Sequence, residues 1–342
     1  MAYTTIKKPS DYFNTKLYSG NSSTQSISGI NFKPDFVWIK ARNQAYNHFL
    51  FDIARGVQKR IKTNSTDAES TVTGLTSFDT DGFSLGSNVD MNGSGVNFAS
   101  WNWLGSNTTA SNTDGSISST VSVNTTSGFS IVSYTGTGAN ATIGHGLGVA
   151  PKVVIIKNRD SAVNWMMYNE AFGDNTKALS LNSTAALDTS ANFFNSTSPT
   201  STVFSVGTNA NTGGASNFIA YCFAEKQGFS KFGSYVGNGS TDGTFIYTGF
   251  KPSMIIVKRT DSLGSWRMWD NKRNPYNLTD TNLRPNTSDT DDTSGNQIDM
   301  LSNGFKIRAT VNIGDTNASG GSYIYMAFAE EPLVGDNPAT AR

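Results

Sequence analysis

The stretch GHGLGVAPKVVIIKNRDSAVNW, from Gly144 to Trp165, combines residue types that could bind a nucleotide. Glycines, a histidine, a lysine and an Arg-Asp pair follow one another, as they do in loops that cradle phosphate groups. A phosphate loop leads into a helix, whereas these glycines precede the continuous apolar run VVIIK, which is typical of a buried strand. We therefore expect the glycines to form a turn that enters a strand, with His145 in that turn.

Other catalytic and metal-binding patterns are scarce. The chain has two histidines, His48 and His145, one cysteine, Cys222, and no H-E-x-x-H motif. This leaves few options for a His-based triad or metal site, and Cys222 lies in an apolar run typical of an inert core thiol. We expect a protein that is not an enzyme and has no cofactor or metal. Two alternatives stay open: a carboxylate pair for glycoside cleavage, and a calcium loop at Asp289–Asp299 instead of an acidic surface turn.

The same order of motifs occurs three times along the chain. Each copy begins with Tyr-x-Gly, continues through a Pro-led apolar run that ends in Lys, and closes on an aromatic run. The Pro-led runs are PDFVWIK, PKVVIIK and PSMIIVK, and only the second follows the glycines quoted above. We expect repeats 1, 2 and 3 at 13–105, 128–226 and 228–331, an N-terminal arm at 1–12, a Ser/Thr/Asn-rich linker at 106–127 and a C-terminal tail at 332–342. The segment 106–127 could equally be a polar strand and turn.

Short apolar runs, alternating patterns and turn dipeptides such as Asp81-Gly82 and Asn303-Gly304 fill each repeat. This pattern predicts an all-β protein of three tandem β-sandwich modules, jelly-roll-like in topology. Helical periodicity is weak, and the best helix candidate is Phe51–Lys62, although it contains a glycine.

Basic and aromatic residues recur after the Pro-led runs and are the candidate ligand-binding residues: Lys40, Arg42, Lys157, Arg159, Lys258, Arg259, Trp165 and Trp266. In one interpretation the cations cap strand ends and pair with acids, while the tryptophans belong to the sandwich cores. In the other, they form a ligand-contacting rim on which sugar rings stack. A basic cluster in the first repeat alone is either a solvated face or a contact for an acidic partner: Arg55, Lys59, Arg60 and Lys62.

Charge and hydropathy narrow the class of partner. Lys+Arg and Asp+Glu both number 26, so the formal net charge is zero, which argues against a nucleic-acid binder. No apolar run is long enough for a membrane span, so we expect no membrane insertion. The first residues lack the apolar core of a secretory signal, and we expect synthesis in a cytoplasm and release by lysis.

Several stretches resemble the DUF7483 family, which occurs in virion proteins of marine tailed phages. The similar stretches are MAYTTIKKPSDYFNTKLYSGN, FKPDFVWIKARN, LFDIARG, SFDTDGFSLGS, GFSIVSYTGTGANATIGHGLGVAPK, IAYCFAEKQGFSKFGSYVGNGSTDG and YIYMAFAE. The resemblance extends over essentially the whole chain, with a slight departure at ASWNWLG. It implies a structural or tail-fibre-like virion component and brings no catalytic residues.

The resemblance and the composition together lead to one functional expectation. We expect a virion protein, made in the host cytoplasm, that acts as a tail-associated adhesin or receptor-binding protein with host surface polysaccharide as its ligand. Its partners would be other virion proteins and further copies of itself, for example in a trimer. A capsid decoration or head-fibre protein is the alternative, and a tail polysaccharide depolymerase is a third.

Overall fold

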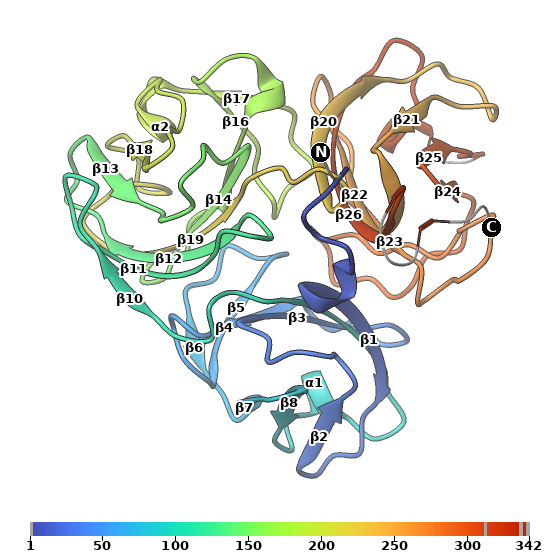
Figure 1. The fold of residues 1–342 in the computed structure, drawn as a ribbon, viewed down its shortest axis with the longest axis horizontal. Helices are drawn as coiled ribbons and strands as arrows, with labels where there is room; N and C mark the ends of the chain where they lie inside the picture. The colour runs from blue at the N-terminus through green and yellow to red at the C-terminus, as the bar shows by residue number, and fades with distance from the viewer. Residues whose placement is uncertain (1–2, 311–312, 335–337, 340–342) are drawn as a thin grey trace.

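The computed structural model describes residues 3–310, 313–334 and 338–339. The protein is all-β, as predicted, and its sheets are open and antiparallel. Figure 1 shows three lobes around a common centre, and each lobe has the colours of one sequence repeat. The helical segments are short: α1 (Val89–Asn92), α2 (Ala191–Phe194), and the 3-10 turns η1 (Pro9–Asp11), η2 (Glu170–Phe172) and η3 (Ile313–Asp315). Within the described ranges, no helix is long and apolar enough to cross a membrane.

Each repeat contributes a sheet with the same order of four strands. The Pro-led run forms the third strand of that order, and β3 and β14 are buried at every residue, as their continuous apolar sequences predict. The first repeat has β1 (Phe13–Ser19), β9 (Asn97–Trp103), β3 (Phe36–Ala41) and β4 (Phe49–Asp52); the second has β12 (Phe129–Thr135), β19 (Asn217–Phe223), β14 (Val153–Asn158) and β15 (Met166–Asn169); the third has β20 (Ser230–Val236), β26 (Ser322–Pro332), β22 (Phe250–Arg259) and β23 (Arg267–Asp270).

A smaller sheet in each repeat faces the larger one across an apolar core, as in a β-sandwich. These sheets are β2 (Gln25–Ser28), β8 (Gly82–Leu85) and β7 (Leu75–Asp79); β13 (Ala141–Gly144) and β18 (Val203–Val206); and β21 (Phe245–Tyr247), β25 (Gly304–Ile307) and β24 (Ile298–Leu301). The remaining strands are β5 (Lys59–Lys62), β6 (Ser70–Thr71), β10 (Ala110–Asn112), β11 (Ser119–Asn124), β16 (Lys177–Ala178) and β17 (Asp188–Thr189).

Two segments differ from the first expectation of their structure. The best helix candidate, Phe51–Lys62, forms no helix: the segment ends β4, turns at Gly56 with a φ of 87°, and continues as β5. The Ser/Thr/Asn-rich segment 106–127 contains β10 and β11, which extend the sheet of the second repeat beside β12. It is therefore a polar strand and turn, the second of the two alternatives, and not a free linker.

A fourth apolar core lies at the centre, where the three lobes meet, and contains residues of all three repeats. Trp103, Phe223 and Phe328 occupy corresponding positions in β9, β19 and β26 and contact one another, with ring centroids 5.3 to 6.3 Å apart. A cavity of about 30 Å³ lined only by apolar and aromatic side chains remains beside them. The repeats therefore share a core and do not hang independently on one chain.

The N-terminal arm lies against the third repeat, as the dark blue segment in Figure 1 shows. Tyr3 Oη donates to the carbonyl of Gly249 at 2.6 Å, and Thr4 Oγ1 donates to the carbonyl of Gln227 at 2.6 Å. Ile6 is buried in the central core. Residues 1–2 of the arm, and 335–337 and 340–342 of the predicted tail, lie outside the described residues.

Candidate functional site

The cations and tryptophans picked out by the repeat pattern lie where two repeats meet. We call these contacts interface 1/2, interface 2/3 and interface 3/1 after the repeats that form them. One backbone hydrogen bond marks corresponding positions in all three: Glu69 N to Arg159 O at 2.8 Å (1/2), Leu187 N to Thr260 O at 2.9 Å (2/3), and Asp291 N to Arg42 O at 2.8 Å (3/1).

The three repeated lysines are fully buried at these interfaces. Their ammonium groups donate to backbone carbonyls: Lys40 to Ala41 (2.6 Å) and Gln44 (3.2 Å), Lys157 to Thr66 (3.0 Å), Ser161 (3.2 Å) and Val163 (2.9 Å), and Lys258 to Thr184 (3.3 Å) and Arg259 (2.6 Å). Burial lowers the pKa of each lysine to about 8, because the charged form loses solvation. Ligand contact by these lysines stays a prediction, and it would require an interface to open.

Two of the repeated arginines form ion pairs across an interface. Arg159 holds Glu69 with two hydrogen bonds of 3.0 Å, and Arg42 Nε lies 2.8 Å from Asp291 Oδ2. Burial alone would raise the pKa of Glu69, but the hydrogen bonds from Arg159 and the charge of Arg55 lower it.

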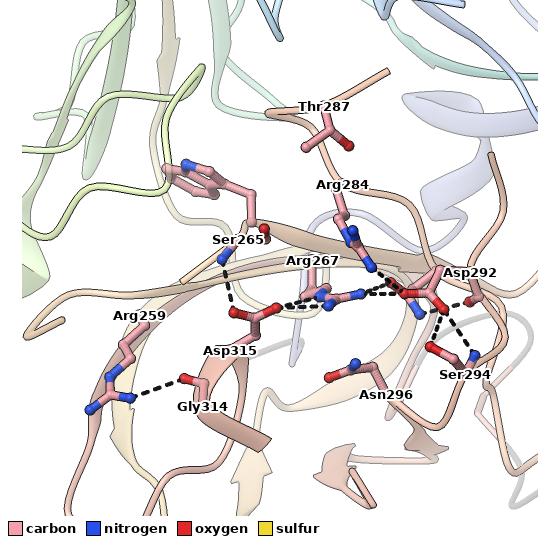
Figure 2. Close-up of polar contacts among 12 residues, drawn as sticks. Arg259, Ser265, Arg267, Arg284, Thr287, Asp292, Ser294, Asn296, Gly314 and Asp315 are labelled. Atoms are coloured by element: carbon pink, nitrogen blue, oxygen red, sulfur yellow. Dashed lines mark hydrogen bonds and ion pairs between the residues drawn. The ribbon is translucent and has the colours of Figure 1, made fainter. Parts of the chain in front are cut away.

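Arg259 is not the structural counterpart of Arg42 and Arg159. The backbone N–H of Arg42 donates to Asn97 and that of Arg159 to Asn217, and the matching bond in the third repeat is from Thr260 to Ser322. The sequence has Lys-x-Arg in two repeats and Lys-Arg in the third, and a shift of one residue along a strand moves a side chain to the other face. Arg259 instead pairs with Asp261. Its guanidinium also donates to the carbonyl of Gly314, as Figure 2 shows.

Behind each interfacial arginine of interfaces 1/2 and 3/1 lies a second, fully buried ion pair. Arg55 Nε contacts Asp52 Oδ2 at 2.5 Å, and Tyr221 of the second repeat donates its hydroxyl to the same oxygen at 2.7 Å. Arg55 also reaches Glu69 at 3.3 Å, so the acid links both arginines.

Interface 3/1 repeats this arrangement with its own residues. Arg273 Nε contacts Asp270 Oδ2 at 2.5 Å and reaches Asp291 at 3.0 Å. Trp101 of the first repeat, in the place of Tyr221, donates its indole N–H to Asp270 at 3.2 Å and lies under the Arg273 guanidinium. Both interfaces thus contain two acids, two arginines and one aromatic donor.

Interface 2/3 contains none of these charges at the corresponding positions. Repeat alignment and strand register place Asn169, Phe172 and Leu187 where the first repeat has Asp52, Arg55 and Glu69, and place Thr260 and Met326 where the second has Arg159 and Tyr221. Interface 2/3 therefore lacks the network of two acids and two arginines, although the buried Lys258 lies there. Sequence reasoning missed these networks, although the spacing Asp-x-x-Arg occurs in the first and third repeats and could have revealed them.

The candidate tryptophans belong to the same interfaces and are buried. Trp165 Nε1 donates to the carbonyl of Lys62 at 2.7 Å, and Trp266 Nε1 donates to that of Ser180 at 3.1 Å. His48 takes their place in the first repeat and accepts at Nδ1 from Trp38 Nε1 at 3.0 Å. Sugar stacking on Trp165 or Trp266 stays a prediction, because neither ring reaches the surface here.

The basic cluster of the first repeat does not form one face. Arg55 points inward to its ion pairs, whereas the other three lie on β5 with local partners: Lys59 with Thr71, Arg60 with Asp90 and Lys62 with Asp67. Contact of Lys59, Arg60 and Lys62 with an acidic partner stays a prediction.

The acidic segment Asp289–Asp299 contacts arginines. Arg267 lies between Asp292 and Asp315, with contacts of 2.7 Å to each, and Arg284 also binds Asp292 at 2.7 Å (Figure 2). Burial alone would raise the pKa of Asp292, but hydrogen bonds from Ser294 and the two arginines hold it well below its usual range. Within residues 3–310, 313–334 and 338–339, no group of three His, Cys, Asp or Glu side chains could hold a metal ion.

The glycine stretch that opened the sequence analysis forms a turn between β13 and β14. His145 is buried, accepts at Nδ1 from the N–H of Leu147 at 3.1 Å and has Nε2 3.1 Å from the carbonyl of Thr200. Gly146 and Gly148 have φ angles of 70° and 72°, which explains their residue type. Cys222 is buried in β19, where loss of solvation raises the pKa of its thiol.

Comparison with known proteins agrees with the resemblance noted in the sequence. No curated protein and no solved structure matches the chain. The family model described as a domain of unknown function, DUF7483, matches residues 8–332, which include all three repeats and every interface residue described above. The chain therefore belongs to the DUF7483 family.

Proposed function

We propose that this chain is a non-enzymatic structural protein on the surface of a tailed-phage virion and that it acts there as a tail-associated adhesin. In this proposal, the three repeats are tandem β-sandwich modules of jelly-roll type. The observation that carries this proposal is that most of the repeated cations and tryptophans form contacts between repeats, so that the three lobes make one rigid body. A rigid body favours receptor binding, because a preorganised surface loses less conformational freedom when the ligand binds.

The surface chemistry supports an adhesin more than an enzyme. The acids Asp52, Glu69, Asp270 and Asp291 are committed to arginines at the interfaces, whereas a glycosidase needs two free carboxyl groups that face one cleft. Serine, threonine and asparagine fill the connecting segments and supply hydroxyl and amide groups for hydrogen bonds to host polysaccharide. The partners in this proposal are other virion proteins and, in a homo-oligomer, further copies of the chain.

One observation favours a second candidate, a capsid decoration protein. Three lobes with corresponding contacts surround a common centre, so one chain could cover a threefold position of a capsid lattice (Figure 1). The tail and capsid proposals share the virion and differ in location.

The test is to locate the protein on purified particles by cryo-electron microscopy. Density with three lobes at the tail tip or baseplate supports the adhesin. The same density at threefold positions of the capsid contradicts the adhesin and supports decoration. Particles that lack the protein altogether overturn both proposals.

A further inference from the structure

A groove of about 690 Å³ opens on the surface beside interface 2/3. Its walls come from both repeats: Phe172, Lys177 and Leu187 from the second, and Ser234, Thr260 and Asp261 from the third. Phe172 and Leu187 are half-buried, so part of each apolar side chain faces the groove. The volume lies within the range of small-molecule binding sites.

The corresponding surface of the first repeat, beside interface 3/1, has only a smaller and shallower depression. A depression of about 290 Å³ lies there, lined by Tyr18, Ser19 and Arg42. The strand register β1–β9 matches β20–β26, so Ser19 corresponds to Val236 and Asn97 to Ser322. The long Arg42 side chain, paired with Asp291, lines this depression at the position where the groove has the short Thr260. The larger groove thus lies where the arginine of the pattern is replaced by the smaller, uncharged Thr260 and the acid by the apolar Leu187.

The replacement also exchanges charge for hydroxyl and apolar groups. Within the lining, Lys177 and Asp261 balance each other in sign, and Asp261 is already held by Arg259. The remaining polar side chains on the lining are hydroxyls, those of Thr189, Ser234, Thr260 and Ser322, beside the tyrosines Tyr235 and Tyr323. An uncharged ligand that is rich in hydroxyl groups and has apolar faces fits this surface, because sugar rings combine both properties.

We propose that this groove binds a neutral oligosaccharide. The ligand lies across interface 2/3, with an apolar ring face against Phe172 and Leu187 and with hydroxyl groups toward the serine and threonine side chains. The inference rests on the proposed adhesin function and names the place and the class of its ligand. It differs from the predicted rim of repeated lysines, arginines and tryptophans, since the groove forms where the arginine of the pattern is missing.

The test measures binding of neutral tetrasaccharides to the full chain by saturation-transfer NMR and titration calorimetry. The panel contains α- and β-linked tetramers of glucose, mannose, rhamnose and N-acetylglucosamine, with tetragalacturonate as the anionic member. We expect at least one neutral member to bind and to do so more tightly than tetragalacturonate. Failure of every neutral member to bind at millimolar concentration overturns the proposal.

Two matched variants assign the binding to the groove. Val236 and Ser19 are exposed at corresponding positions, so V236R places a long cation over the large groove and S19R places one over the small depression. We expect V236R to weaken binding about tenfold or more and S19R to leave it unchanged. Equal affinity of V236R and the natural chain, or an equal loss in S19R, overturns the proposal.

A third variant uses the ion pair of the protein itself as the obstruction. The double substitution T260R/L187E copies the pair Arg159–Glu69 into interface 2/3 and should abolish binding while the thermal unfolding midpoint stays close to that of the natural chain. Because these measurements use isolated protein, they are independent of the cryo-electron microscopy test. A groove that binds saccharide in a protein absent from the particle leaves this inference standing and overturns the proposed function.

Discussion

At the scale of single residues, the protein places charges in its interior and satisfies them there. Two buried Asp–Arg pairs, Asp52–Arg55 and Asp270–Arg273, have fully buried side chains and carry additional hydrogen bonds from the neighbouring repeat. Removing one partner of such a pair leaves the other as an unpaired buried charge and lowers the free energy of unfolding. Replacing both partners by residues of suitable shape often changes that free energy little. The second repeat contains that replacement naturally, as Asn169 and Phe172.

This contrast gives the first prediction. D52N should lower the free energy of unfolding by about 3 kcal/mol, because Arg55 keeps its charge in a buried site with only Glu69 left to pair with it. The double variant D52N/R55F, which copies the second repeat, should regain more than half of the loss. Urea unfolding of the natural chain, D52N, R55F and D52N/R55F gives the double-mutant cycle that tests this prediction. A double variant as unstable as D52N would contradict our account.

The second prediction concerns pH and His48. His48 Nδ1 accepts a hydrogen bond from Trp38, and burial with the nearby charges of Lys40 and Arg273 lowers the pKa of its ring below 6.5. His48 therefore binds a proton at a higher pH in the unfolded chain than in the folded protein. Its contribution to the free energy of unfolding is fully present above about pH 6.5 and decreases below it, by up to about 1.4 kcal/mol per pH unit.

His48→Gln is the variant that checks this, since its amide oxygen can still accept from Trp38 and does not titrate. Unfolding free energies at about pH 7 and about pH 5 should differ less in this variant than in the natural chain. His145 is also buried with a lowered pKa, so H145Q provides the matched control and should retain the part due to His48. An unchanged pH dependence in H48Q would refute the assignment.

At the scale of elements, the sequence contains enough information for strands but not for their partners. The buried strands β3 and β14 follow directly from their apolar runs, and the hairpin turns follow from Asp-Gly and Asn-Gly dipeptides. The helix candidate at Phe51–Lys62 forms no helix, because Arg55 points inward to its ion pair and Lys59–Lys62 form β5, which pairs with β4 and β6.

The site was harder to predict than the strands for a physical reason. The local sequence around a lysine at the end of a strand does not show whether that end faces solvent or another repeat. Lys40, Lys157 and Lys258 could therefore be interpreted as a ligand-contacting rim. Only the packing of the lobes decides between the two. The one-residue offset of Arg259 was visible in the sequence, and the alternation of strand faces could have excluded it from the set.

A third prediction tests the close approach of strands in the smaller sheets. Gly304 begins β25, and a Cβ atom there would lie 2.1 Å from the carbonyl oxygen of Ile246 in β21. G304A should therefore lower the free energy of unfolding by roughly 3 kcal/mol, since the strands must separate. G320A is the control, because Gly320 has a φ of 71° with open space around it and should cost only about 1 kcal/mol. Equal losses would contradict this explanation.

At the scale of the whole molecule, the central core makes the three repeats one unit. Trp103 contacts aromatic rings from all three repeats, including Phe36, Phe129 and Phe328. A shared core of this kind couples the unfolding of the lobes, because none can leave without exposing apolar surface of the other two.

The fourth prediction follows from this coupling. W103A should lower the stability of the whole chain by about 3–5 kcal/mol, and calorimetry should show one transition at a lower temperature. W103F copies Phe223 and Phe328 and should cost far less, since Trp103 Nε1 has no hydrogen-bond acceptor among the described residues. Two transitions of which only one shifts would show that the lobes unfold independently.

The unequal chemistry of the three interfaces also encodes the order of the lobes around the centre. The second repeat presents no acid–arginine network to the third, and the third presents none to the second. Any exchange that sets the third repeat after the first would bury Glu69 against Thr260, without the arginine that it meets in Arg159. The absence of this ion pair therefore distinguishes interface 2/3 from the other two. Only one cyclic order of the three lobes leaves both Glu69 and Asp291 paired with an arginine.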